Sequence, residues 1–436
     1  MIWRLLRRTM SRHGRMDMLQ LFGDLAALYA PARIRERRES GTGTARLNVA
    51  QRHYGLDWLR IAAFALLVPY HAALVFAPAH WLVNAREGVD ALVVPMALMT
   101  PWRLALLFAV SGFASRKLLG KSDDIRAFLA SRSARLLVPL GFAMVALLPL
   151  EVWIRAVQGG YQQGLAAFWL RDYWRWGTYW GVEMPSWEHL WFVAYLWFYT
   201  MVLGALLALG LLPRLQRWFD DLTAGIGLLW LPIAGLVLAK LAVTFVLPEH
   251  GGVLTDWNAH ATNFPLFVLG FLIAGGRHAW GDIARLWRQA ALAACVCAAI
   301  VVHTDLTWSA SEMPSHFWTA LDRAARMAMA WSMIVLLFHA ANTRFNRDHP
   351  WRATLAEAVF PAYIVHQVAI VAIAWWMRPA GGTAWLGEYA LILGGTLATC
   401  AAFYLVGSRI APLRPLIGLA ARKATAKPVA SPAVSA

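Results

Sequence analysis

Long apolar runs follow one another along the chain from about residue 55 to residue 411, and short polar segments separate them. A helix needs about 20 residues to cross a hydrocarbon core of about 30 Å, and most of the runs have this length. The runs do not alternate with the period of two that a membrane β-barrel shows. The pattern therefore predicts ten membrane-spanning helices, at residues 59–79, 91–114, 136–154, 189–212, 226–247, 261–275, 289–304, 320–341, 356–377 and 385–411.

The predicted fold is an all-α, polytopic membrane helix bundle. Hydrophobic residues make up 59% of the 436 residues and charged residues only 15%, whereas about 25% of a soluble domain is charged. Residues 55–411 would form the membrane-embedded domain. It follows a basic N-terminal extension at residues 1–54, which is either functional or the product of an over-called start codon. A basic tail at residues 412–436, rich in Pro, Ala and Ser, is expected to be disordered and cytoplasmic.

The net charge of +16 is unevenly distributed along the chain, and its distribution predicts the topology. Segments that would lie inside carry 30 Lys and Arg residues, whereas the opposite loops carry 5. Because basic residues stay on the cytoplasmic side of membrane proteins, both termini are expected in the cytoplasm. The 24 Trp residues suit the interfacial belts of such a protein. A nucleic-acid partner is not expected, since the chain lacks a soluble fold with a basic face.

One histidine, His71, stands in the middle of the first apolar run, near whose start Arg60 lies. The two residues are eleven positions apart, or about three helical turns, so they share one helix face about 16 Å apart along the axis. An ionisable side chain at membrane depth is costly and is by default a functional hypothesis. The alternatives are a packing role for His71 and an anchoring role for Arg60, whose side chain would reach the lipid headgroups.

Other polar residues stand near the ends of the apolar runs. Ser111 closes the second run, where a small residue also permits close helix packing. Arg132 and Arg135 lie one turn apart at the start of the third run, a spacing that suits a phosphate but also fits simple topogenic charge. His189 opens the fourth run and His366 lies within the ninth, and each has a packing role as its alternative.

The chain lacks the motifs of several other kinds of site. It contains no Walker motif, no GxGxxG loop, no GxSxG elbow and no zinc-binding spacing. Its three cysteines, Cys295, Cys297 and Cys400, all stand in apolar runs and suggest no disulfide framework. No metal is expected, and any chemistry must use the polar groups within the membrane.

The ordered set of these residues resembles the acyltransferase-3 family of integral membrane acyltransferases. Arg60 and His71 are spaced as in the family's first span, and LLFAVSGFASRKL, SRSARLLVP, HLWFVAYL and YIVHQ resemble its later motifs in the same order. The resemblance covers about residues 52–411 and looks closest to the glucan biosynthesis protein C branch, which is implicated in succinylating periplasmic glucans. The chain departs from the pattern at Ala194-Tyr195, where many relatives carry an acidic residue.

The resemblance implies a multi-pass enzyme of the bacterial inner membrane. It would move an acyl group from cytoplasmic acyl-CoA, as acetyl-CoA or succinyl-CoA, to a hydroxyl of an extracytoplasmic carbohydrate such as a periplasmic glucan. His71 would act as general base or as acyl acceptor, with Arg60 and Ser111 as further catalytic residues. A succinyl group would need another cation near the thioester, for which Arg103 and Lys240 are candidates.

The resemblance also assigns binding residues and partners. Arg132 and Arg135 would hold the phosphates of acyl-CoA, while His189, Trp191 and His366 would receive the polysaccharide or glycolipid acceptor. Membrane lipids would surround the bundle. Acyl delivery would be completed either by this chain alone or with a partner protein.

A different class of function also fits the pattern. Transporters and exporters of small anionic or acylated metabolites keep ionisable groups in their spans, and they break helices at Gly and Pro. Pro69 stands two residues before His71, so a broken first helix is compatible with the sequence. The paired arginines at one mouth favour an acyl-CoA-binding enzyme over a symmetrical transport pathway.

Overall fold

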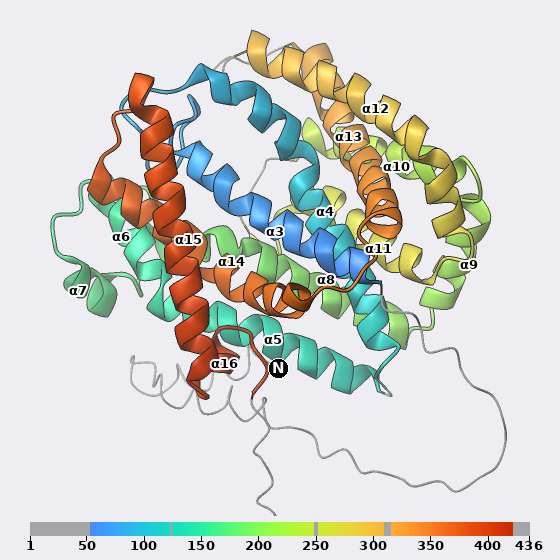
Figure 1. Cartoon of the computed structure of the whole chain (residues 1–436), viewed down its shortest axis with the longest axis horizontal. Coiled ribbons are helices and arrows are strands. Elements are labelled where there is room, and N and C mark those ends of the chain that lie inside the picture. The colour runs from blue at the N-terminus through green and yellow to red at the C-terminus, as the bar shows by residue number, and fades with distance from the viewer. Residues whose placement is uncertain (1–52, 123, 248–251, 309–314, 422–436) are drawn as a thin grey trace, which may run out of the picture.

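The computed structural model describes residues 53–122, 124–247, 252–308 and 315–421. Within them the chain is built almost entirely of helices (Figure 1). The long helices are α3 (Tyr54–Leu74), α4 (Val93–Leu119), α5 (Ile125–Ala146), α8 (Trp191–Ala208), α10 (Gly227–Thr244), α11 (Trp257–Gly275), α12 (Ala279–Thr307), α13 (His316–Thr343), α14 (Pro350–Met377) and α15 (Trp385–Arg409).

Shorter elements connect the long helices. The short α-helices are α6 (Leu148–Gln158), α7 (Leu165–Ala167), α9 (Leu212–Leu222) and α16 (Leu413–Leu416). Single turns form η1 (Asp90–Leu92), η2 (Phe168–Asp172), η3 (Glu188–Leu190) and η4 (Gly382–Ala384). The one sheet in the described residues is an antiparallel pair, β1 (Gly177–Tyr179) and β2 (Val182–Met184), which pairs Gly177 with Met184.

The expected fold class is confirmed. Each of the ten predicted spans coincides with helical structure, and eight helices in the described residues are long and apolar enough to cross a membrane. The other two predicted spans form α3 and α11, which are 21 and 19 residues long. Polar side chains, such as Arg60 and His71 on α3 and Asn258 and His260 on α11, make the apolar stretches of these two helices less hydrophobic than those of the other eight. The chain is therefore a multi-pass helix bundle, and two of its helices, α3 and α11, contain polar residues within their apolar sequences.

The third predicted span, residues 136–154, is wrong in its boundaries. The helix ends at Ala146, and a second helix, α6, begins at Leu148 after a break at Leu147. Pro149 fits this break, because it stands in the first turn of α6, where its missing N–H leaves no helical hydrogen bond unmade. The apolar run hid this break, since Leu147 and Leu148 are as hydrophobic as the helices on either side.

Helix starts follow the local sequence. The carboxylate of Asp124 accepts a hydrogen bond from the backbone N–H of Arg126 at the start of α5. Asp256 accepts one from the N–H of Ala259 at the start of α11, at 2.9 Å. These side chains satisfy backbone donors that a helix leaves unpaired, which is why the helices begin there.

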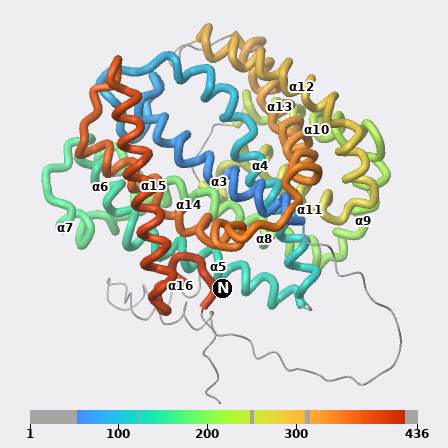
Figure 2. Tube along the Cα trace, in the orientation of Figure 1, coloured from blue at the N-terminus to red at the C-terminus, as the bar shows by residue number. Residues whose placement is uncertain are grey.

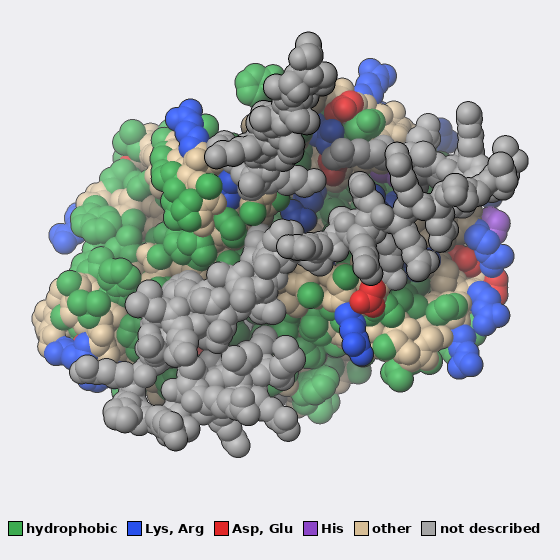
Figure 3. All heavy atoms as spheres, turned by 90° about the horizontal axis from the view of Figure 1, so that it is seen from below, with side chains coloured by type: hydrophobic (Ala, Val, Ile, Leu, Met, Phe, Trp, Pro, Cys, Tyr) green, Lys and Arg blue, Asp and Glu red, His purple; other side chains and the backbone are tan. Residues whose placement is uncertain are grey.

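The helices differ in how much of their apolar surface the protein itself buries. In the apolar window of α14, 61% of the residues are buried, whereas α12 and α15 bury only 22% of theirs. Exposed apolar side chains on this scale mark a lipid-facing surface. Figure 3 shows broad areas of hydrophobic side chains on one face of the molecule. Helix α14 is therefore central, while α12 and α15 lie at the periphery.

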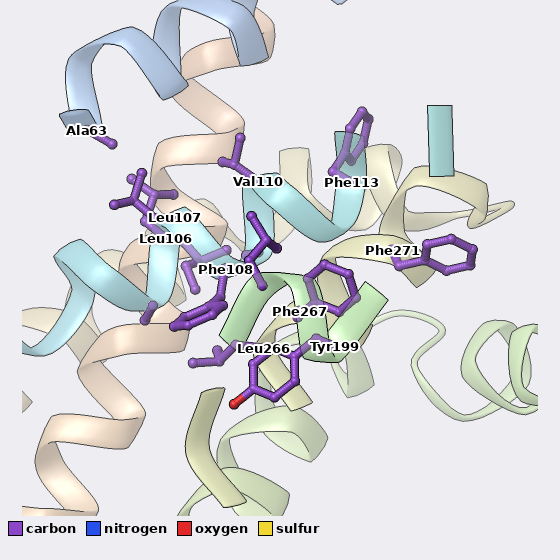
Figure 4. Packing of buried hydrophobic residues seen from close by; sticks show 14 of the residues in the cluster. Ala63, Leu106, Leu107, Phe108, Val110, Phe113, Tyr199, Leu266, Phe267 and Phe271 are labelled. Atoms are coloured by element: carbon purple, nitrogen blue, oxygen red, sulfur yellow. The ribbon is translucent and has the colours of Figure 1, made fainter. Parts of the chain in front are cut away.

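The largest core cluster lies where α4 packs against α11 and α8. Phe108 of α4 has its ring centre 4.6 Å from that of Phe192 and 5.5 Å from that of Tyr199, both on α8 (Figure 4). Gly112 on α4 and Gly270 on α11 let the two helices approach, because a Cβ on either would collide with a backbone carbonyl of the other helix. Helices in lipid use small residues in this way. The tube view shows the two helices side by side (Figure 2).

The predicted extension and most of the predicted tail lie outside the described residues. The start of the tail, which the sequence analysis expected to be disordered from Pro412, is instead packed. Helix α16 is followed by Ile417 and Leu419, which are both buried, and Arg414 forms an ion pair with Glu357 at 2.9 Å. These apolar side chains dock the segment on the bundle, and the hydrophilic composition of the later residues concealed this.

Candidate active site in the membrane domain

Helix α3 carries both Arg60 and His71, as the spacing predicts. It crosses the middle of the molecule and packs against α14, α13 and α15 (Figure 1). Pro69 lies inside the helix and does not end it. His71 is partly accessible, in contrast to the fully buried histidines described next.

His71 and His366 are joined across two helices. The Nδ1 atom of His71 lies 2.9 Å from Nε2 of His366, which is on α14, and the two ring planes are within 9° of parallel. The other ring nitrogen of His366, Nδ1, lies 2.7 Å from the carbonyl oxygen of Tyr363, one turn earlier on α14. His366 is 1% exposed, so these contacts fix its ring within the bundle.

The hydrogen-bond geometry fixes the direction of this chain of donors. A backbone carbonyl only accepts, so Nδ1 of His366 carries the proton and donates to Tyr363. In a neutral imidazole the other nitrogen is then an acceptor, so His71 donates from Nδ1 to Nε2 of His366. This leaves Nε2 of His71 with a lone pair that no hydrogen bond among the described residues uses. His366 thus orients the His71 ring, an arrangement that suits the predicted role of His71 as a base or nucleophile, since catalytic triads orient their histidine in the same way.

His189 lies beside this pair and is held in a different way. Its Nε2 donates to the carbonyl oxygens of Tyr363 and Ile364 at 3.1 and 3.2 Å. The hydroxyl of Tyr363 in turn donates to the carbonyl of His189. The two links tie the start of α8 to the middle of α14 and place the His189 ring centre 5.1 Å from that of His366.

Glu151 completes the buried group. It comes from α6, is fully buried, and accepts a hydrogen bond from Gln367 at 2.7 Å. Its other oxygen, Oε2, faces Nδ1 of His189 at 3.9 Å. Neither of these two atoms has a hydrogen-bond partner among the described residues. We refer to His71, His189, His366, Glu151 and Gln367 as the histidine network.

The predicted phosphate-binding residues form a second group at the other end of α3. Arg132 on α5 has two charged neighbours, Arg135 and Arg60. Its Nη2 lies 3.4 Å from the hydroxyl of Ser115, a long contact, and Ser115 donates to the carbonyl of Ser111 at 2.8 Å. Arg135 is exposed. We refer to Arg60, Arg132 and Arg135 as the arginine cluster.

The remaining predicted residues lie between or beside these groups. Ser111 is partly buried on α4. The serine that lies within hydrogen-bond distance of Arg132 is Ser115, one helical turn after Ser111. Trp191, at the start of α8, has its ring centre 5.1 Å from that of Tyr195 and is half-buried. Direct contact of Trp191, His189 or His366 with a carbohydrate stays a prediction.

A cavity of about 410 Å³ opens on the side of the histidine network that is predicted to face outward. It lies between the loop after α3, the end of α6 and the end of α14. Its polar and aromatic lining includes Trp81, Asn84, Arg86, Gln158, Trp375 and Arg378. Trp81 lines the cavity, and the centre of its indole ring lies 6.3 Å from that of the His71 ring. The candidate base therefore lies next to a residue of the cavity wall.

The comparison with known families decides what kind of protein holds this site. A family model described as an acyltransferase domain, Acyl_transf_3, matches residues 53–405. The chain belongs to the acyltransferase-3 family. The match contains every residue of the histidine network and of the arginine cluster. No curated protein and no solved structure matches the chain in the corresponding searches.

Membership of the acyltransferase-3 family makes the chain a multi-pass membrane acyltransferase. The polar groups buried in the bundle are the candidates for its acyl-transfer site. Within the described residues, no group of three or more His, Cys, Asp and Glu side chains is arranged to hold a metal ion.

Sequence reasoning missed part of this acyltransferase-3 site. It assigned no role to Glu151, and it included Tyr363 only as the first residue of the YIVHQ motif. Gln367, the partner of Glu151, stands 216 positions away in the chain, and His189, the partner of Tyr363, stands 174 positions away. No local sequence pattern reveals pairs at such separations. Arg103 was named only as one of two candidate cations. The structure places it beside the histidine network and places Lys240 on α10, where it donates to Asn258.

Proposed function

We propose that this acyltransferase-3 protein is an acyl-CoA-dependent O-acyltransferase of the bacterial inner membrane. It moves an acetyl or succinyl group from cytoplasmic acyl-CoA to a hydroxyl of an extracytoplasmic carbohydrate, such as a periplasmic glucan. The observation that carries the proposal is the free lone pair on Nε2 of His71, between a cationic group at one end of α3 and a cavity at the other.

The arginine cluster is the proposed donor site. Acyl-CoA carries several phosphates, and guanidinium groups bind phosphate oxygens through charge-assisted hydrogen bonds. His71 stands about 16 Å farther along α3, a distance set by eleven residues at about 1.5 Å each. The pantetheine arm would thread between the helices over this distance and bring the thioester to His71. The weak contact of Arg132 with Ser115 leaves its guanidinium available to a ligand.

The transfer step is a base-assisted attack on the thioester. Nε2 of His71 takes the proton of the acceptor hydroxyl while that oxygen bonds to the thioester carbonyl carbon. The tetrahedral intermediate then collapses, the carbon–sulfur bond breaks, and the leaving thiolate takes the proton from Nε2. The products are the carbohydrate ester and free CoA. Alternatively, Nε2 attacks the thioester itself, the carbon–sulfur bond breaks and CoA leaves as the thiolate. The acceptor hydroxyl then attacks the acyl-imidazolium, the carbon–nitrogen bond breaks, and the hydroxyl proton goes to the thiolate.

The outer cavity is the proposed entrance for the carbohydrate. Indole rings stack on the apolar faces of sugars, and amide and guanidinium groups hydrogen-bond to hydroxyls. Trp81 and Trp375 supply the first kind of contact, and Arg86 and Arg378 supply donors. No metal takes part in the proposed chemistry. Whether this chain needs a partner protein for delivery follows from the purified assay described below.

The test is mass spectrometry of envelope glycans from a strain that lacks the gene and carries wild type, empty vector or His71→Ala. We expect an acyl mass increment with wild type that disappears with His71→Ala at equal membrane level, and the increment names the acyl group. Acylation that depends on the gene but survives His71→Ala would exclude the His71 mechanism. Unchanged glycans together with substrate counterflow in proteoliposomes would replace the enzyme by a transporter.

A further inference from the structure

Arg103 is a buried cation that the proposed steps leave unused. It lies near the middle of α4, in one of the eight apolar spans, and only 9% of its surface is exposed. Its Cζ atom lies 3.3 Å from the ring centre of Tyr70, so the guanidinium covers the aromatic face. The hydroxyl of Tyr70 shares a hydrogen bond with Thr100 at 2.8 Å.

In the part of the chain that the structure describes, no carboxylate is paired with Arg103. Among the described residues it forms no ion pair, and its Nε and Nη1 atoms are buried without a hydrogen-bond partner. The other strongly buried guanidinium, that of Arg352, contrasts with it because it is paired with both Asp57 and Asp348. Contact with the neutral Tyr70 side chain offsets only part of the desolvation penalty of a buried charge, so we expect Arg103 to lower the stability of the ligand-free bundle.

Arg103 stands beside the reactive histidine. Tyr70 directly precedes His71 on α3, and their ring centres lie 5.8 Å apart, so the guanidinium and the imidazole flank the same phenol ring. Lys240, the other buried cation considered, lies on α10 and already donates a hydrogen bond to the side chain of Asn258.

We propose that Arg103 binds a negatively charged oxygen of the acyl group while that group is held at His71. An uncompensated cation in a dry site becomes favourable when a substrate brings the missing negative charge. Two sources of this oxygen share the same chemistry. One is the carbonyl oxygen, which becomes an oxyanion when the acceptor attacks; the other is the free carboxylate of a dicarboxylic acyl group, two methylenes from the thioester in succinyl-CoA.

The proposal rests on the proposed function and predicts an unusual pair of effects for Arg103→Met. Replacing an unpaired buried charge by an apolar side chain of similar length removes the desolvation penalty, so the thermal stability of the ligand-free protein should rise. Acyl transfer should nevertheless fall by at least about 10²-fold, the loss seen when one donor to an oxyanion is removed. A purely structural arginine would lower both stability and activity together.

The experiment uses the full chain, purified in lipid nanodiscs with envelope glycans of the deletion strain as acceptor. Release of free CoA thiol is measured with acetyl-CoA and with succinyl-CoA, and the Tm is measured without substrate. Lys240→Met is the matched control, since it removes a buried cation that has a partner. We expect it to lower the Tm and to keep the rate of transfer.

The two donors distinguish the two sources of charge. A fall in kcat with both donors at unchanged KM assigns Arg103 to the oxyanion, whereas a loss confined to succinyl-CoA assigns it to the carboxylate. Arg103→Lys should recover part of either loss because it restores the charge without the guanidinium geometry. Rates within twofold of wild type for Arg103→Met, or a clear drop in its Tm, would overturn the proposal. A purified wild-type protein that is inactive with both donors, together with unacylated glycans in the strain that carries the wild-type gene, would overturn the proposed function as well.

Discussion

The histidine network and the arginine cluster lie at the two ends of the same face of α3, but they are held in opposite ways. His189 and His366 are buried and bonded to backbone carbonyls of α14, and Glu151 is bonded to Gln367. In the arginine cluster, Arg135 is exposed and Arg132 makes one long contact to a hydroxyl. Side chains that transfer protons need a fixed geometry. Side chains that bind the phosphates of a flexible ligand instead need hydrogen-bond donors that the protein itself does not occupy.

The largest expected effect comes from the one residue that the network presents to a substrate. His71→Ala should lower acyl transfer by about 10²-fold to 10⁴-fold, because it removes the proposed base or nucleophile. The rate is measured as release of CoA by the purified protein. His303→Ala, which changes an exposed histidine on α12, should keep the wild-type rate. Equal rates for the two variants would mean that the network has no chemical role.

The second prediction separates positioning from chemistry within the network. His366→Ala leaves His71 in place but removes the acceptor of its Nδ1–H, so the ring loses its orientation. We expect kcat to fall between about 10-fold and 10²-fold, as for other groups that orient a functional histidine, with KM unchanged. His366→Gln, which keeps an acceptor, should recover part of kcat. A change in KM alone would assign His366 to substrate binding.

The third prediction concerns the arginine cluster. Arg132→Gln and Arg135→Gln should each raise KM for acyl-CoA by about 10-fold to 10²-fold, since each removes a charge-assisted hydrogen bond worth about 1.5–3 kcal/mol. The value of kcat should change little. Arg344→Gln, an exposed arginine predicted to lie on the same side of the membrane, is the control. If KM stays at the wild-type value in both variants, the cluster serves topology rather than donor binding.

The fourth prediction tests the helix contact that places both regions. A Cβ at Gly112 would collide with the carbonyl of Phe267, so Gly112→Ala should push α4 away from α11. Overpacking of this kind costs about 1–3 kcal/mol, which should lower the Tm in detergent. Gly141→Ala, at a glycine of α5 with open space around it, should leave the Tm unchanged or raise it. A lower Tm for Gly141→Ala than for Gly112→Ala would contradict the packing account.

The smallest effect is expected in the outer loop, which lies outside both regions. Hydrogen bonds from Arg171 hold the pKa of the buried Asp172 carboxyl below its ordinary value. A lowered carboxyl pKa adds stability at neutral pH, and this stability is lost as the pH falls through the folded-state pKa. Asp172→Asn should therefore lower the Tm slightly at pH 7 and less at pH 4. A loss of acyl transfer at unchanged Tm would instead connect this loop with the acceptor.

Particular residues show why the sequence predicted the fold better than the site. Ten apolar runs predicted the helices because the bilayer sets their length, and this constraint is local. The break at Leu147 shows the limit of such a prediction. Because the residues on both sides of the break are hydrophobic, the apolar run continues through it and does not reveal where one helix ends and the next begins. The pairing of Arg60 with His71 on one face followed from helical periodicity. The partners of His71 and Glu151, which are His366 and Gln367, could not follow from any local period.

The sequence by itself determined the bundle of apolar helices, the family to which the chain belongs and the presence of ionisable groups at membrane depth. Hydrophobicity and helical period are properties of short segments, so they can be interpreted without knowing how segments meet. Only the tertiary structure decided that Nε2 of His71 is the free nitrogen, because this depends on a carbonyl of α14. It also decided that Arg103 rather than Lys240 stands beside that histidine, since burial and pairing are set by neighbours that are distant in the chain.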